Sequence, residues 1–152
     1  MGLLKDDLKF GLNAEKGVKP ILETLFGKLT KTEDKFNNFD FYNDKYYVEH
    51  KQRNIVFGQF DSLIFDKCKY DKYLELKEKN PKLQFFVVWS LRDDRFMWKM
   101  NEDSSQFYIK HEFNVNRGTY TQTTKTMCVK NEFIYPFDDF EVVVKKKKKS
   151  KN

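Results

Sequence analysis

The sequence predicts a single α+β (α/β) domain in which helices flank a central mixed β-sheet. Three observations support this class: helical spacing of apolar residues near the N-terminus, alternation of apolar and charged residues in the next segment, and the apolar run KLQFFVVWSL further on. A chain of 152 residues can bury a hydrophobic core without disulfide bonds. We expect one domain over residues 1–144, followed by a disordered polybasic tail over 145–152.

An amphipathic helix is predicted from about Asn13 to Leu29, despite Gly17 and Pro20 near its start. Its apolar residues recur at helical spacing: Val18, Ile21, Leu22, Leu25, Phe26 and Leu29. Glu15 lies three residues before Val18 and seven before Leu22. It should therefore project from the side of the helix that faces the core.

Two strands and a second helix are expected next. The strands, over residues 36–42 and 45–53, are joined by a turn at Asn43-Asp44, and a short strand within residues 27–32 is the candidate that precedes them. The second helix should run from Asp61 to Lys79, because Asp61 or Ser62 can cap its start and Asn80-Pro81 follows its end.

Further strands fill the C-terminal half of the chain. KLQFFVVWSL is a mostly apolar strand, and RDDR turns it into RFMWKM, which gives a hairpin with Trp89 and Trp98 in the core. QFYIKHEFNV and the segment from Thr126 to Tyr135 predict additional C-terminal β-hairpins.

A functional site is predicted from the alternation of apolar and charged residues in FDFYNDKYYVEHKQRN. If Asn43-Asp44 is a two-residue turn, Tyr42 faces Lys45 and alternate residues share one face of the sheet. One face then holds Asp40, Tyr47, Glu49 and Lys51. The other holds the apolar residues Phe39, Phe41, Tyr46 and Val48. A four-residue loop preserves this division, whereas a three-residue loop destroys it.

Two carboxylates that converge on one point repel each other unless a cation lies between them. Asp40 and Glu49 offer hard oxygen ligands, which suit Mg²⁺ or Mn²⁺. A bound metal would polarise a phosphodiester, and Lys51 could orient the attacking water or stabilise the developing charge. The chemistry that fits is metal-assisted phosphodiester hydrolysis.

The spacing of Asp40 and Glu49-His50-Lys51 resembles the D…(D/E)xK signature of the PD-(D/E)XK, or restriction-endonuclease-like, nuclease superfamily. The resemblance implies a restriction-endonuclease-like core of helix, three strands, helix and strand, similar to the order expected from Asn13 to Leu91. It also implies an additional acidic residue on the preceding helix, a place that Glu15 occupies. The implied catalytic residues are Asp40, Glu49, Lys51 and Glu15, with Asp40, Glu49 and Glu15 as ligands of Mg²⁺ or Mn²⁺. Compact viral and phage members of the superfamily are the most similar.

Other functions stay open at this stage. The [D/E]xK pattern also occurs at residues 7–9, 33–35 and 75–77, in helix or loop and without a suitably paired Asp. Lys51 could simply form ion pairs with Asp40 and Glu49 on a solvated sheet face. The alternative to a nuclease acting on DNA is therefore a degenerate nuclease fold that serves as a nucleic-acid-binding or assembly module, or a plain structural domain.

Contacts to nucleic acid are expected from four further residues. Lys67 and Lys69 fall on or beside the second helix, where related nucleases often place a basic residue that faces DNA, and Lys69 is favoured. Tyr47 shares the acidic face and could stack on a base or sugar. Arg117 lies in the polar segment NRGTYTQTTK and could contact a phosphate.

The charge of the chain is concentrated in its tail. The net charge is +6, and without the six lysines of KKKKKSKN the chain holds 23 basic and 23 acidic residues. Such a tail can bind polyanions or anionic lipid, or act as a nuclear import signal. We expect an intracellular protein, cytoplasmic or nuclear, from an AT-rich genome of viral type, with no membrane span because no run of about 18 apolar residues is present. A homodimer is compatible with the sequence, and Cys68 and Cys128 are expected to be buried, unpaired thiols.

Overall fold

A computed structural model of the chain describes residues 17–33, 39–117 and 120–140. Within residues 112–124 it describes the backbone alone. The class is α+β, with a mixed central sheet and two α-helices in the described part of the chain, as the sequence predicts. Glu15 and the lysine tail lie outside the described residues.

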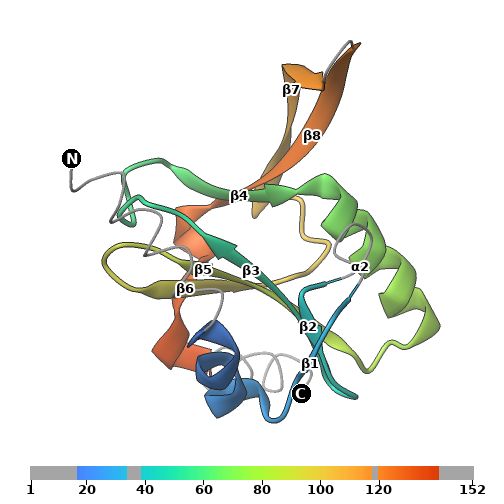
Figure 1. The fold of residues 1–152 in the computed structure, drawn as a ribbon, viewed down its shortest axis with the longest axis vertical. Coiled ribbons are helices and arrows are strands. Elements are labelled where there is room, and N and C mark those ends of the chain that lie inside the picture. The colour runs from blue at the N-terminus through green and yellow to red at the C-terminus, as the bar shows by residue number, and fades with distance from the viewer. Residues whose placement is uncertain (1–16, 34–38, 118–119, 141–152) are drawn as a thin grey trace.

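The central sheet has six strands in the order β1-β2-β3-β5-β6-β9 (Figure 1). Their bounds are Thr30–Lys31 (β1), Phe41–Tyr42 (β2), Tyr46–Gln52 (β3), Gln84–Ser90 (β5), Arg95–Lys99 (β6) and Tyr135–Pro136 (β9). β3 and β5 are parallel, and the other neighbouring strands are antiparallel. β5 is apolar throughout most of its length because it lies between β3 and β6 and is buried on both faces.

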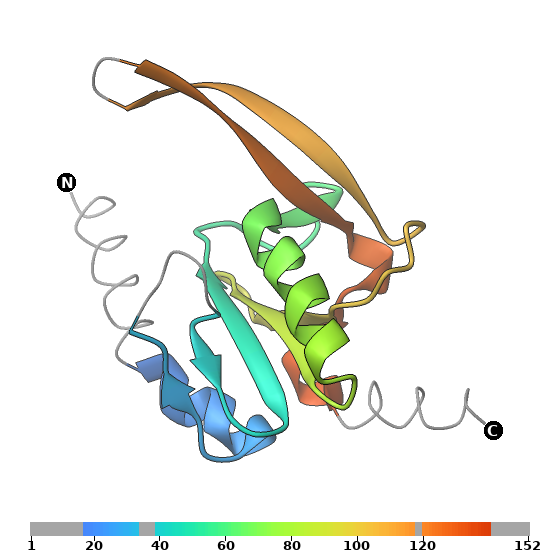
Figure 2. The same cartoon turned by 90° about the vertical axis from the view of Figure 1, so that its right-hand side faces the viewer.

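A second sheet of three strands lies beside the first, in the order β4-β8-β7. Its strands are Ser62–Asp66 (β4), Phe107–Arg117 (β7) and Tyr120–Lys130 (β8). The β7–β8 hairpin extends away from the rest of the molecule (Figure 2). A short 3₁₀ turn at Asn131–Phe133 leads the chain back to β9 of the central sheet, and a second one at Phe137–Asp139 follows β9.

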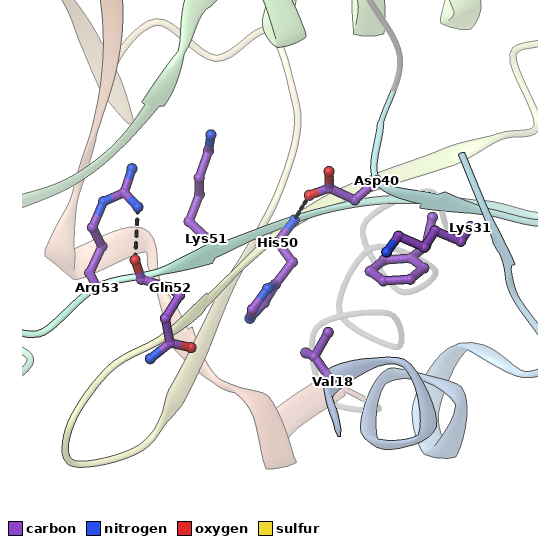
Figure 3. A pocket seen from close by; sticks show the side chains of 8 residues that line it. Val18, Lys31, Asp40, His50, Lys51, Gln52 and Arg53 are labelled. Carbon is purple, nitrogen blue, oxygen red and sulfur yellow. Dashed lines mark hydrogen bonds between the residues drawn. The ribbon is translucent and has the colours of Figure 1, made fainter. Parts of the chain in front are cut away.

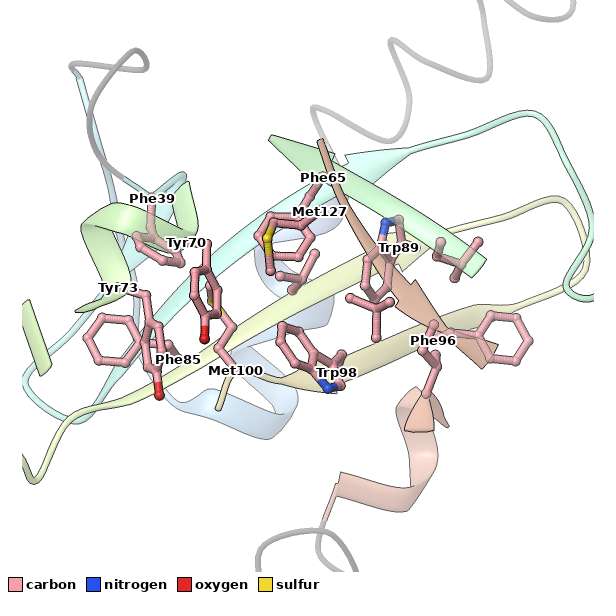
Figure 4. Packing of buried hydrophobic residues seen from close by; sticks show 14 of the residues in the cluster. Phe39, Phe65, Tyr70, Tyr73, Phe85, Trp89, Phe96, Trp98, Met100 and Met127 are labelled. Carbon is pink, nitrogen blue, oxygen red and sulfur yellow. The ribbon is translucent and has the colours of Figure 1, made fainter. Parts of the chain in front are cut away.

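The two faces of the central sheet are covered by different elements. On one face, the first helix (residues 17–26) contributes Val18, Leu22 and Phe26 to a buried cluster with Val48 and Phe86. On the other face, helix α2 (Lys67–Lys79) and the second sheet enclose a larger aromatic cluster (Figure 4). This cluster contains Trp89 and Trp98, which confirms their predicted place in the core.

The helix predicted from Asp61 is wrong in its first part. Ser62–Asp66 is strand β4, paired antiparallel with β8 in the register Ser62↔Lys130, and helix α2 begins only at Lys67. Alternation explains the difference, because Leu63 and Phe65 point into the core while Ile64 is exposed.

The turn between β2 and β3 also differs from the prediction. Tyr42 pairs with Tyr47, so the loop has four residues rather than two. Asn43 fixes this loop: its side chain accepts hydrogen bonds from the backbone N–H groups of Lys45 (2.9 Å) and Tyr46 (2.7 Å). Its amide nitrogen donates to the carbonyl of Phe26 at 2.9 Å, which ties the loop to the end of the first helix.

Candidate functional site

The register of β2 and β3 brings the predicted acidic residues together. Phe41 pairs with Val48, and one further step along the strands places Asp40 opposite Glu49. A loop of four residues keeps the same parity as a loop of two, so Glu49 and Lys51 share a face of β3, and Asp40, which precedes β2, lies within electrostatic reach of Glu49. Phe39, which was expected on the other face, instead contacts Tyr47 and Phe85 on the side of Glu49.

Glu49 lies in the core rather than on a solvated face. Its side chain is only 3% exposed, because helix α2 covers this side of β3. Lys51 Nζ lies 3.4 Å from Glu49 Oε2, and Lys69 Nζ lies 3.8 Å from Glu49 Oε1. Glu49 Oε1 is buried and accepts no hydrogen bond from the described residues. The carboxylate is therefore held by two ammonium groups but is incompletely satisfied.

The prediction that Lys69 faces nucleic acid is wrong. Lys69 is 4% exposed, since it points from α2 into the interior toward Glu49. The prediction is wrong for two reasons: helix α2 begins later than predicted, and it covers the face of the sheet that was expected to be open to solvent. Lys69 is a buried partner of the acidic site.

The environment of Glu49 changes its acidity. The pKa of Glu49 is raised from 4.5 to about 7, because burial and, to a smaller extent, the negative charge of Asp40 raise it more than Lys51 and Lys69 lower it. A shift of this size is unusual for a glutamate. Such a perturbed carboxyl is typical of functional sites, although buried structural ion pairs produce it too.

Asp40 stands where the pairing of β2 with β3 ends. β2 covers only Phe41 and Tyr42, and the backbone N–H of His50 donates to Asp40 Oδ2 at 2.8 Å. The carboxylate thus takes the place of a strand partner for His50. This bond fixes Asp40 against β3, within electrostatic reach of Glu49.

A pocket of about 360 Å³ opens along this edge of β3 (Figure 3). Lys51 and Arg53 point to one side of the strand and His50 and Gln52 to the other (Figure 3). Lys31 and Asp40 also line the pocket, whereas Glu49 does not. Three cationic side chains beside one carboxylate suit a phosphate group better than a neutral ligand.

His50 and Gln52 add polar groups to the pocket. His50 Nε2 lies 2.7 Å from Ser90 Oγ, and burial together with Arg95 lowers the pKa of His50 to about 4. His50 is therefore neutral at pH 7. Both polar atoms of the Gln52 amide are buried and have no hydrogen-bond partner among the described residues. A ligand in the pocket could satisfy them.

Asp66 belongs to the site, and the sequence analysis did not identify it. Its Oδ2 lies 3.7 Å from Lys51 Nζ, at the junction of β4 and α2. The side chain is 64% exposed, so it is open to solvent and to ligands. The alternation in SLIFD was the available signal, because it predicts a strand that ends at Asp66 rather than a helix that passes through it.

The other predicted residues do not join this cluster. Lys67 forms an ion pair with Asp71 at 2.6 Å on the surface of α2. Tyr47 stacks on Tyr42 with ring centroids 5.6 Å apart and packs against the aromatic core, so most of its ring is not available to a base. Arg117 ends β7, in the part described by its backbone alone.

Neither a disulfide bond nor a cluster of metal ligands is found among the described residues. Cys68 and Cys128 are both thiols that form no disulfide bond, but Cys68 is exposed rather than buried as predicted. Across residues 17–33, 39–117 and 120–140, no three side chains of His, Cys, Asp or Glu are grouped closely enough to hold a metal ion by themselves. No helix in the same residues is long and apolar enough to cross a membrane.

No family model matches this chain, and comparisons with curated proteins and with solved structures give no match either.

Proposed function

We propose that this chain is a metal-dependent nuclease of restriction-endonuclease-like architecture that hydrolyses phosphodiester bonds, with DNA as its substrate. The observation that carries the proposal is the position of Asp40, bonded to the backbone N–H of His50 next to Glu49, together with Lys51 Nζ 3.4 Å from Glu49 Oε2. The order of elements from the first helix through β1, β2, β3, α2 and β5 supports it, with β4 as an addition before α2.

The residues present fit Mg²⁺ or Mn²⁺. Asp40 and Glu49 would hold the ion through carboxylate oxygens, and Glu49 Oε1 is an acceptor without a hydrogen-bond donor among the described residues. After burial, repulsion from Asp40 is the next largest cause of the raised pKa of Glu49, and a cation would relieve this repulsion. Two protein ligands are sufficient for Mg²⁺, which usually keeps several waters. When bound, the ion would supply Lewis acidity and a water of lowered pKa.

The chain's own residues have separate tasks in this scheme. Lys31 and Arg53 bind the phosphate in the pocket, and Arg53 does so with a planar fork of donors. Lys51 lies between Glu49 and the pocket, where its ammonium group can stabilise charge that develops on the phosphate oxygens. Lys69, on helix α2, lowers the pKa of Glu49 and so favours its ionised form. It therefore acts as a positioning residue.

A second candidate is a nuclease fold that binds nucleic acid without cleaving it. It is favoured by one observation: Glu49 does not line the pocket and is already neutralised by two lysines. In this case the site would be an ion-pair network within the core. Asp40, Lys31 and Arg53 would then only contact the nucleic acid.

The experiment that separates the candidates is incubation of the purified full chain with plasmid and with circular single-stranded DNA. Parallel reactions contain Mg²⁺, Mn²⁺ or chelator, and a Glu49→Gln preparation controls for contaminating nucleases. We expect cleavage with either metal and none in chelator. Binding of DNA without cleavage under every condition would favour the second candidate, and equal cleavage by Glu49→Gln would show that the activity of the preparation does not depend on Glu49.

Asp40→Asn provides a test that needs no substrate. The asparagine oxygen can still accept the bond from the His50 N–H, while the repulsion with Glu49 disappears. We expect the melting temperature in chelator to be equal to or higher than that of the wild type. Metal should stabilise the wild type by about 2.7 kcal/mol at a concentration 100 times its Kd, and the variant by much less. Thermal unfolding across a metal titration measures both quantities.

Asp71→Asn is the matched control, because Asp71 is exposed and paired with Lys67 outside the site. Its response to metal should equal that of the wild type. A destabilised Asp40→Asn together with a wild type that is indifferent to metal would contradict the nuclease proposal.

A further inference from the structure

A second pocket of about 360 Å³ lies where β4, β7 and β8 meet the end of β3. Its walls include Phe60, Ile64 and Tyr108, which are 56%, 39% and 44% exposed. A single exposed apolar residue is common on protein surfaces, whereas a group of three around one concavity indicates a binding site. The Tyr108 hydroxyl lies 3.4 Å from Ser62 Oγ, which restricts the orientation of the ring.

The two pockets share one residue. Arg53 lines the pocket that contains Asp40 and Lys51, and it also lines the apolar pocket. Lys110 provides a second cation beside the apolar pocket. A ligand that passes from one pocket to the other would therefore offer an anionic group near Arg53 and a flat apolar group between Phe60 and Tyr108. A nucleotide has both parts.

We propose that the apolar pocket accepts an unpaired nucleobase of the strand whose phosphate lies beside Arg53. This inference rests on the proposed function and specifies its substrate class. Aromatic side chains bind bases by stacking, and they do so largely without sequence preference. A base within a duplex is stacked and paired and cannot enter the pocket. The preferred ligand is accordingly single-stranded or locally unpaired nucleic acid.

The test is fluorescence anisotropy in chelator, so that no cleavage is needed. The probes are a short labelled single strand, a strand of the same length with abasic sites at its centre, and the duplex. The abasic strand keeps every phosphate, so its binding reports the electrostatic contribution alone. We expect the strand with bases to bind about tenfold more tightly than the abasic strand, within the range measured for stacking on aromatic residues.

Phe60→Ala and Tyr108→Ala should each reduce this ratio strongly while leaving the affinity for the abasic strand unchanged. Tyr108→Phe should preserve the ratio, because the ring remains. Leu74→Ala is the control, since Leu74 is a 36% exposed apolar residue on α2 that does not line the pocket. All three side chains are substantially exposed in the wild type, so the four variants should fold.

Three results would overturn the inference. One is equal affinity of the wild type for both strands, and another is a loss of affinity in Tyr108→Ala that is the same for both. The third is a dimer that forms with rising protein concentration and is lost in Phe60→Ala without any effect on base selectivity, which would assign the pocket to a second copy of the chain. Base-selective binding in a protein that fails to cleave would support the pocket while removing the nuclease proposal, so the two can fail separately.

Discussion

Lys51→Ala is expected to lower the rate of metal-dependent cleavage by about 10²–10³-fold, the usual effect of removing one group that stabilises charge in a transition state. The Lys51 side chain is 17% exposed and lies between the buried Glu49 and the phosphate pocket. Single-turnover cleavage with excess enzyme measures the effect without interference from product release. Glu49→Gln and Asp40→Asn should lose at least as much activity, since they remove the ligands of the metal.

Lys51 also lowers the pKa of Glu49, so its loss could act indirectly through protonation of that carboxyl. Raising the pH distinguishes the two effects. An indirect effect would disappear at about pH 9, where Glu49 ionises again, whereas a direct effect persists at every pH. Lys79→Ala is the control, because Lys79 is 71% exposed and pairs with Glu75 on α2. Equal losses in Lys79→Ala and Lys51→Ala would show that the wrong motif has been chosen.

Lys69→Met is expected to reduce the free energy of unfolding by about 3 kcal/mol at about pH 8, the lower end of the range for breaking a buried ion pair. Methionine keeps most of the packing of the lysine side chain. Glu49 loses its ion pair with Lys69 and keeps the one with Lys51. At about pH 5.5, where Glu49 is protonated in the folded protein, the loss should be smaller. Urea unfolding in chelator at the two pH values measures the difference.

The pH dependence of this loss of stability follows from the direction in which the pKa of Glu49 is shifted. The pKa of Glu49 is raised from 4.5 to about 7, so its contribution to stability is complete below about pH 4.5 and is lost as the pH rises through 7. Removing Lys69 raises this pKa further, which enlarges the loss at the higher pH. His50 has the opposite dependence, because its pKa is lowered, but it is common to both proteins and cancels in the comparison.

Two further variants serve as controls for Lys69→Met. In a Glu49→Gln background, Lys69→Met should cost much less and show no dependence on pH across this interval. Lys67→Met, which breaks the surface pair with Asp71, should cost no more than about 1 kcal/mol. Equal losses at both pH values in Lys69→Met would mean that Lys69 contributes only packing.

The shared face of Glu49 and Lys51 could be predicted from sequence, because alternate residues of one strand lie on the same side of a sheet. The loop has four residues rather than two, yet the register Tyr42↔Tyr47 keeps the parity of the pairing between β2 and β3. The strand β5 and the β5–β6 hairpin were equally accessible, since a continuous apolar run between turn residues has few other interpretations.

The burial of the site could not be predicted in the same way. Alternation of apolar and charged residues normally indicates one solvated face. Here helix α2 covers that face, and its residue Lys69 forms an ion pair with Glu49. That contact joins residues 20 positions apart through a helix whose start was placed six residues too early. The alternation in SLIFD was a local signal for β4, but the partner of this strand, β8, lies 60 to 68 residues later in the chain and is not indicated by local propensity.

The parallel pairing of β3 with β5 has a consequence for the order of folding. Glu49 lies beside Val87, and the chain between them, which contains β4 and α2, must turn back before the two strands can pair. Closing so long a loop costs more entropy than forming the β5–β6 or β7–β8 hairpin, whose strands follow each other directly. We expect the hairpins to form early and the pairing of β3 with β5 to form late. Glu49 therefore enters the interior, and meets Lys69, only as the crossover closes, so that an almost folded intermediate would have a solvated glutamate with an ordinary acidity in place of the site.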